Sequence, residues 1–185
     1  MKELLEILKI VVVCVAGAVV YGIVHDQITA RVCVEYFSVA HPPVFGDIQS
    51  PTLLGLGWGV IATWWVGAIL GVPLGICARV GSLPKVGVRG IFRVLVVMLG
   101  ILLVVAMVSG WCGYEAYEGG AIRLPKMWEE RIPVERHARF MFDACAHLAS
   151  YGVGALMGMG MWVYVLGMRW RERKSDGRQS GAARD

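Results

Sequence analysis

The stretch 53-LLGLGWGVIATWWVGAILGVPLGICA-78 contains no charged residue. A helix rises about 1.5 Å per residue, so this run is long enough to cross a hydrocarbon core of roughly 30 Å. Pro51 suits the first turn of such a helix, and Pro73 predicts a kink near its far end. The stretch therefore predicts a transmembrane helix over residues 53–78.

Three more apolar runs follow the same pattern, over residues 4–24, 91–112 and 140–168. The chain is 57% hydrophobic and only 17% charged, whereas about a quarter of the residues in a soluble domain are charged. The sequence predicts an all-α fold, a four-helix transmembrane bundle that forms one domain over residues 1–168. The outer connections are residues 25–52 and 113–139, and residues 27–39 of the first are expected to add a helical segment outside the membrane.

Basic residues decide the expected orientation, because cytoplasmic loops carry an excess of Lys and Arg. Of the 18 Lys and Arg residues, 12 flank the ends of the runs on the side of both termini, and 6 lie in the outer connections. Both termini are therefore predicted to be cytoplasmic, in a multi-pass protein whose partner is the lipid bilayer. The net charge of +4 is explained by topology and does not indicate nucleic acid. The polar tail, residues 169–185, is expected to be a disordered cytoplasmic segment.

Small residues recur every fourth position along the second run, at Gly55, Gly59, Thr63, Gly67, Gly71 and Gly75. Gly154 and Gly158 repeat the spacing in the fourth run. Such stripes allow helix backbones to approach closely in lipid. We expect the second and fourth helices to pack together through them, with a homo-oligomer formed through the same stripes as the alternative.

Ionisable residues gather on the predicted outer side, and they are the candidates for function because charges at this depth are costly unless paired. All four histidines fall there. On a first helix that continues past the membrane, His25 and Glu35 lie within about 80° of each other, and Asp143 and His147 are one turn apart. Imidazole and carboxylate ligands suit zinc, iron or manganese. One hypothesis is thus a metal site drawn from His25, Glu35, His41, Asp143 and His147.

A second hypothesis is a structural one, in which buried ion pairs only stabilise the bundle. Arg31 would pair with Glu35, and Arg136 or Arg139 would pair with Asp143. The protein would be a non-catalytic structural or partner-binding membrane protein. Separately from these hypotheses, Asp26 is expected to cap the helical segment over residues 27–39.

Two further hypotheses are a small transporter or proton relay and membrane-enzyme chemistry without a metal. No G-x-S-x-G, P-loop or G-x-G-x-x-G motif is present, so the sequence assigns no reaction. Among the five cysteines, Cys33, Cys112 and Cys145 lie toward the outer side, where one disulfide can form.

Several segments resemble a family of uncharacterised bacterial inner-membrane proteins without an assigned activity. The resemblance rests on 25-HDQITARVCVEYF-37 with His41-Pro42, on Pro51-Thr52-Leu53 and 56-LGWG-59, and on 146-AHLASY-151. Together these segments cover about a third of the chain. The resemblance implies a bacterial inner membrane and a multispan fold, and it implies no mechanism.

Overall fold

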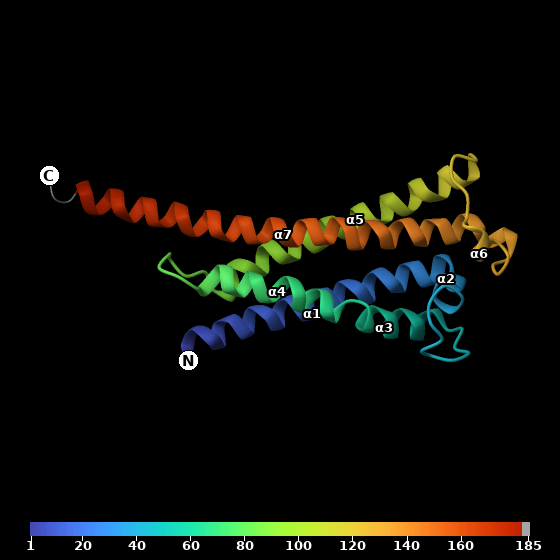
Figure 1. Cartoon of the computed structure of the whole chain (residues 1–185), viewed down its shortest axis with the longest axis horizontal. Coiled ribbons are helices and arrows are strands. Elements are labelled where there is room, and N and C mark those ends of the chain that lie inside the picture. The colour runs from blue at the N-terminus through green and yellow to red at the C-terminus, as the bar shows by residue number, and fades with distance from the viewer. Residues whose placement is uncertain (183–185) are drawn as a thin grey trace.

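The computed structural model describes the backbone of residues 1–182 and the side chains of residues 1–175, and this part of the chain is helical with no strand. The elements are α1 (Lys2–Val32), α2 (Val34–Ser38), α3 (Pro51–Ile61), α4 (Trp64–Arg79), α5 (Val88–Glu118), α6 (Lys126–Glu129), the 3-10 turn η1 (Val134–Arg136) and α7 (His137–Ala182) (Figure 1). The predicted all-α class is confirmed.

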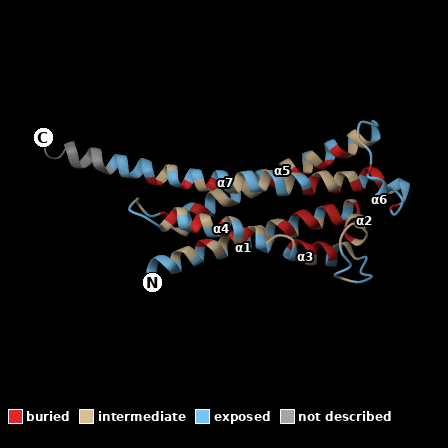
Figure 2. Cartoon of the chain, viewed as in Figure 1, coloured by how far each residue is buried: buried red, intermediate tan, exposed pale blue. Residues whose placement is uncertain are grey.

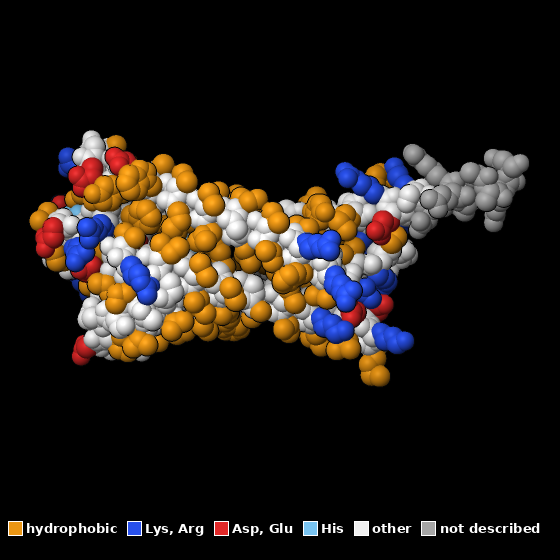
Figure 3. All heavy atoms as spheres, turned by 180° about the vertical axis from the view of Figure 1, so that it is seen from behind, with side chains coloured by type: hydrophobic (Ala, Val, Ile, Leu, Met, Phe, Trp, Pro, Cys, Tyr) orange, Lys and Arg blue, Asp and Glu red, His pale blue; other side chains and the backbone are white. Residues whose placement is uncertain are grey.

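Within the described part of the chain, four helical segments are long and apolar enough to cross a membrane: Lys2–Val32, Pro51–Arg79, Val88–Glu118 and Val134–Ser175. Hydrophobic side chains cover the middle of the molecule, and Lys and Arg side chains gather at the end from which the C-terminal tail extends (Figure 3). This pattern is typical of a multi-pass membrane protein, because lipid replaces water around the apolar band. The four predicted runs each correspond to one of these segments.

The second segment is interrupted, which the sequence did not predict at this place. α3 ends at Ile61, and α4 begins at Trp64 and runs through Pro73. The Thr63 hydroxyl donates to the Gly59 carbonyl, and a side-chain bond of this kind is known to bend helices. The second segment is thus broken at Ala62–Thr63, whereas α4 continues through Pro73, and the kink expected there stays a prediction.

The chain after residue 168 also differs from expectation. α7 continues as a helix to Ala182, where the composition of residues 169–185 predicted disorder. Arg169 is buried near the start of this extension. Residues 183–185 lie outside the described residues.

The helices pack as two groups, α1 with α3 and α4, and α5 with α7, as the ribbon shows (Figure 1). The glycine stripe of the second segment faces α1 and not α7, so that part of the expectation is wrong. A methyl group on Gly59 would lie 2.6 Å from Ile23 Cα, and one on Gly67 would lie 2.7 Å from Val15 Cα. Only glycine allows this backbone approach, and α1 occupies the surface that a second copy would need.

Two glycines of α7, Gly154 and Gly158, accept side chains from other helices instead. A Cβ on Gly158 would meet Leu70 of α4 at 2.6 Å, and one on Gly154 would meet Leu102 of α5 at 3.2 Å. The Trp162 indole donates to the Leu70 carbonyl at 2.9 Å, which joins α7 to α4.

A buried arginine fixes the two groups of helices at the end nearest the chain termini. Arg169 is 1% exposed, and among the described residues it donates to the Cys77 carbonyl of α4 and to the Val80, Leu83 and Pro84 carbonyls of the α4–α5 connection. An apolar cluster that includes Ile10, Leu74, Ile91 and Val165 lies beside it. Buried residues gather toward the two ends of the bundle, and α7 has none between His147 and Met161 (Figure 2).

Candidate metal centre

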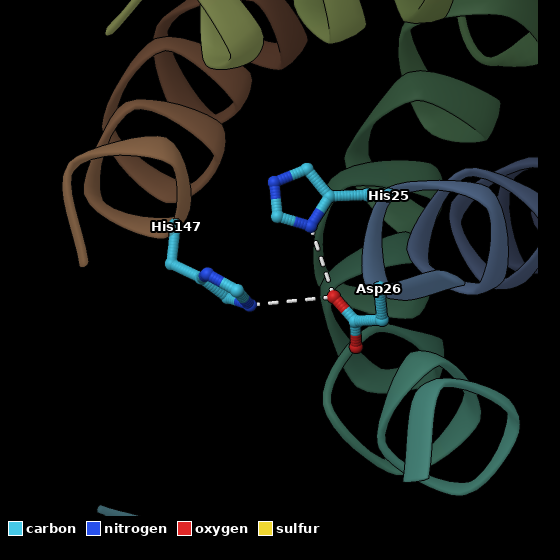
Figure 4. Close-up of side chains that lie close together, drawn as sticks. All are labelled: His25, Asp26 and His147. Atoms are coloured by element: carbon cyan, nitrogen blue, oxygen red, sulfur yellow. Dashed lines mark hydrogen bonds and ion pairs between the residues drawn. The ribbon is translucent and has the colours of Figure 1, made fainter. Parts of the chain in front are cut away.

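Three ionisable side chains converge at the opposite end of the bundle: His25 and Asp26 from α1, and His147 from α7 (Figure 4). His25 Nδ1 lies 2.9 Å from Asp26 Oδ1, and His147 Nε2 lies 3.3 Å from the same oxygen. One ligand atom from each residue lies within 4.8 Å of the other two. The side chains expose only 2, 7 and 11% of their surface in that order. We call these residues the His/Asp cluster.

The hydrogen bonds of His147 fix its protonation pattern. Its Nδ1 lies 2.7 Å from the Asp143 carbonyl, which can only accept, so Nδ1 carries the proton. In a neutral imidazole Nε2 is then an unprotonated acceptor, and it faces the Asp26 carboxylate at 3.3 Å. Two acceptors in contact repel each other. A cation between them, either a metal ion or a proton on Nε2, removes the repulsion.

His25 offers a second free nitrogen. Its Nδ1 donates to the Asp26 carboxylate at 2.9 Å, which leaves Nε2 as the acceptor of the neutral ring. Among the described residues, this buried Nε2 has no hydrogen-bond partner. Buried polar atoms without partners are uncommon, and each needs an explanation, such as a bound ion or an ordered water.

Aromatic rings hold the two imidazoles in place. The centroids of the Tyr36 and Phe37 rings lie 4.5 and 5.5 Å from that of His147, and the Tyr21 ring is stacked on His25 at 5.7 Å. α2 supplies two of these rings, so this short helix covers the cluster. Rings locked by packing cannot turn away, which preorganises the two imidazoles.

His41 lies beside the His/Asp cluster but outside it. Its ring centroid is 6.5 Å from that of His147, and its Nδ1 donates to the Tyr36 carbonyl at 2.8 Å. Burial lowers the pKa of His41 below its ordinary value, because the charged imidazolium loses solvation. His41 therefore faces the same space as a neutral neighbour of the cluster.

Glu35 is placed differently from the sequence prediction. α1 ends at Val32, Cys33 is extended with φ −146° and ψ 96°, and Glu35 belongs to α2. Its Oε1 lies 3.4 Å from Arg136 Nε, and its Oε2 accepts from the Cys33 thiol at 3.4 Å. Burial, with the nearby Asp143 carboxylate second, raises the pKa of Cys33 to about 12. Glu35 is thus the partner of an arginine and lies outside the cluster.

The expected arginine pairs are also rearranged. Arg31 donates to the carbonyl and the side-chain oxygen of Gln27 and to the Thr52 hydroxyl, and not to Glu35. Arg136 pairs with Glu35 and not with Asp143. Arg139 is exposed and makes no ion pair among the described residues. A clamp between α2 and the start of α7 exists, but with other partners than predicted.

Asp143 is fully buried, and neither carboxylate oxygen has a hydrogen-bond partner among the described residues. Its backbone carbonyl, not its side chain, binds His147. An unpaired ionised carboxylate in such surroundings would be very costly. Asp143 therefore positions His147 through its backbone, and its carboxyl group is not among the three converging ligands.

The cluster opens into a cavity of about 140 Å³ between α1, α4, α5 and α7. His25, Asp26, His41 and His147 line one end. Tyr21 and Ser150 also line it, and their hydroxyls lie 2.7 Å apart across the cavity. Leucine and methionine side chains of α4, α5 and α7 line most of the rest.

Asp26 is the residue that sequence reasoning missed. It was interpreted as a helix cap, whereas α1 continues through it and its carboxylate contacts both histidines. The available signal was its position inside a run of helix-forming residues directly after His25. An acidic residue inside a continuous helix cannot cap it, and it must find a partner when buried.

All five cysteines are free, so no disulfide joins Cys33, Cys112 and Cys145.

No family model, curated protein or solved structure matches the chain. The resemblance to bacterial inner-membrane proteins therefore remains a prediction, and the function must be argued from the site itself.

Proposed function

We propose that this chain is a multi-pass membrane protein that binds a divalent transition-metal ion at His25, Asp26 and His147. The observation that carries the proposal is the contact between His147 Nε2 and Asp26 Oδ1 at 3.3 Å, where two acceptors face each other. A metal ion converts repelling lone pairs into ligands.

The spacing suits a small ion. Two ligands bound at 2.0–2.1 Å in tetrahedral geometry lie roughly 3.3 Å apart. The distance from His147 Nε2 to Asp26 Oδ1 has that value, and the distance from His25 Nδ1 to the same oxygen is somewhat shorter at 2.9 Å. To bind the ion, His25 Nδ1 would have to give up the proton that it donates to Asp26, and the His25 ring would have to move slightly outward.

The donor set narrows the choice of metal. Two imidazoles and one carboxylate are found at catalytic zinc sites, which keep an open position for water or substrate, and at non-haem iron(II) sites. Zinc is the first choice, and iron and manganese are the alternatives. The cavity beside the cluster supplies the space for a fourth ligand. A zinc ion there would lower the pKa of a bound water, which would make hydrolysis accessible.

A proton is the alternative occupant. A protonated His147 would form an ion pair with Asp26, and the cluster would then join α1 to α7 without a metal. The ion pair between Arg136 and Glu35 favours this structural interpretation, because it also joins elements at the same end. The two proposals predict different metal contents.

The membrane and the orientation are part of the proposal. Lys and Arg side chains gather at the end that carries the N-terminus and the tail, and this end is expected to face the cytoplasm of a bacterial cell (Figures 1 and 3). The His/Asp cluster then lies near the outer face of the inner membrane. A reporter of membrane topology fused after Pro125 should give a signal from outside the cytoplasm. A cytoplasmic signal would show that the proposed orientation is wrong.

Elemental analysis tests the metal. Protein purified without chelator at neutral pH should carry close to one equivalent of zinc, iron or manganese. Asp26→Asn and His147→Ala should lose it. Glu35→Gln is the matched control, because Glu35 binds Arg136 and should leave the metal content unchanged. Metal-free wild-type protein that cannot be reloaded with zinc would favour the protonated ion pair.

A further inference from the structure

The cavity beside the His/Asp cluster changes character along its length. On α1 its lining residues run from Asp26 and His25 through Gly22 and Ala18 to Cys14. Twelve steps along a helix correspond to about 18 Å. Polar groups line the end at the cluster, and Leu70, Leu95 and Met161 belong to the apolar remainder. The lining of this long cavity, polar at one end and apolar along the rest, matches an amphiphilic molecule with a polar group at one end of an apolar chain.

The size of the cavity exceeds what water needs. One water requires roughly 10–15 Å³ of such space, and the cavity has about 140 Å³. An apolar cavity of about this size stays dry and accepts a benzene-sized group. Water in its apolar part would find few polar partners, so the expected occupant is hydrocarbon.

The surroundings supply that hydrocarbon. The four helices that enclose the cavity belong to the four candidate membrane spans. Lipid chains are as apolar as leucine, so a chain that moves from lipid into the cavity loses no favourable burial. It gains the dispersion contacts that an empty space would lack. Affinity for one molecule over another must then come from the polar end.

We propose that this cavity binds the alkyl chain of a membrane amphiphile, with the polar group of that molecule at the His/Asp cluster. The assignment of the polar end rests on the proposed metal function, and the assignment of the chain does not. A carboxylate or phosphate head group would fit the open position of a metal held by His25, Asp26 and His147. The substrate or ligand class is thus a lipid-like molecule with an anionic head group.

Ala155 and Leu156 provide a matched pair of variants on α7. Ala155 lines the cavity, and Leu156 is 66% exposed and does not line it. Ala155 is also exposed, so Ala155→Phe places a ring at the wall of the cavity, whereas Leu156→Phe adds bulk at a position that does not line it. The two variants have neighbouring positions and the same final residue, so general effects on folding should be similar.

The experiment uses a long-chain fatty acid with a photoreactive diazirine in the middle of its chain. Full-length protein in lipid nanodiscs is illuminated with this probe, and the labelled residues are mapped by mass spectrometry. Wild-type protein and Leu156→Phe should be labelled at cavity residues such as Met98 and Met157. Ala155→Phe should reduce that labelling about tenfold, which corresponds to roughly 1.4 kcal/mol. Labelling of the lipid-facing Val97, which is 61% exposed, should not change.

The outcomes separate the two proposals. Cavity labelling at the level of Val97 in all three proteins, or equal labelling in the two variants, would overturn the chain assignment. Metal content is measured on the same samples by elemental analysis. Specific labelling of metal-free protein would support the alkyl-chain site and contradict the metal site. Bound metal without specific labelling would support the metal site and contradict the alkyl-chain site. His147→Ala should lose the metal but keep labelling at Met98.

Discussion

A single methyl group at Gly55 perturbs the His/Asp cluster without changing a ligand. Gly55 lies on α3 against α1, where an added Cβ would be 2.8 Å from the Asp26 carbonyl oxygen and 3.0 Å from its carbonyl carbon. Ordinary contact begins at 3.4 Å, so the two backbones must separate by about 0.6 Å. Both contacts are with backbone atoms, which cannot rotate away.

The expected magnitude follows from the contact. Overpacking of this kind costs about 1–3 kcal/mol, and the better helix propensity of alanine offsets up to about 1 kcal/mol. Gly55→Ala should therefore lower the free energy of unfolding by roughly 1–2 kcal/mol. Ligands must be held to within about 0.5 Å, and mutation of a supporting residue typically weakens metal binding about 10–100-fold. We expect zinc affinity to fall about tenfold.

Two glycines serve as controls for this variant. A Cβ on Gly100 would meet nothing within 4 Å, so Gly100→Ala reports the effect of alanine alone. Gly75 lies on the same stripe far from the cluster, and its Cβ would meet the flexible Ile7 side chain first, at 3.0 Å. Stability is measured by denaturation with sodium dodecyl sulfate in mixed micelles, and zinc affinity by competition with a chromophoric chelator. Gly55→Ala with the stability and affinity of Gly100→Ala would refute the reasoning.

Three other predictions concern separate parts of the molecule. Arg169→Met should lower the free energy of unfolding by roughly 3 kcal/mol, because it leaves the carbonyls of Val80, Leu83 and Pro84 without their charged donor. Arg171 is exposed, so Arg171→Met should change the stability little. Similar denaturation curves for the two variants would contradict this prediction. Cys33 is fully buried with a pKa of about 12, so at pH 8 iodoacetamide should modify the exposed Cys112 much faster, and equal rates by mass spectrometry would be inconsistent with the structure. Burial lowers the pKa of His41 in the folded state, so the unfolded chain binds more protons and stability should fall as pH drops below about 6.5. The decrease in stability with falling pH should be smaller in His41→Gln. An identical decrease in both proteins between pH 7.5 and 5.5 would argue against a desolvated His41.

The membrane segments were predictable because lipid imposes a simple pattern on sequence. A run such as 53–78 has no charge to place in hydrocarbon, and its length matches a bilayer. The break at Thr63 was harder to foresee, because it depends on one hydroxyl bonding to the Gly59 carbonyl. Threonine in a helix has other options for its hydroxyl, and the sequence does not say which one it takes.

The composition of the candidate site was predicted only in part. His25 and His147 converge as expected, but Glu35 does not join them, because the prediction extended α1 past Val32 at 100° per residue. The extended backbone at Cys33 changes the direction of everything that follows. A one-residue interruption of this kind is set by tertiary packing, and helical periodicity cannot reveal it.

The partner of the glycine stripe was likewise beyond the sequence. The spacing of Gly55, Gly59 and Gly67 indicates that some helix approaches closely, but any of the other three helices satisfies that requirement. In the structure α1 is the helix that packs against the glycine stripe, and this packing affects the His/Asp cluster. The same close contact that Gly55 allows holds the backbone of Asp26 where its side chain meets His147.

Anomalous diffraction from crystals of the purified protein tests the metal centre most directly, with data collected at the absorption edge of the metal that elemental analysis identifies. The account predicts one strong peak between His25, Asp26 and His147, at about 2.0–2.2 Å from each ligand atom. A well-resolved His/Asp cluster without a peak, or a peak at Glu35 or Asp143 instead, would contradict it.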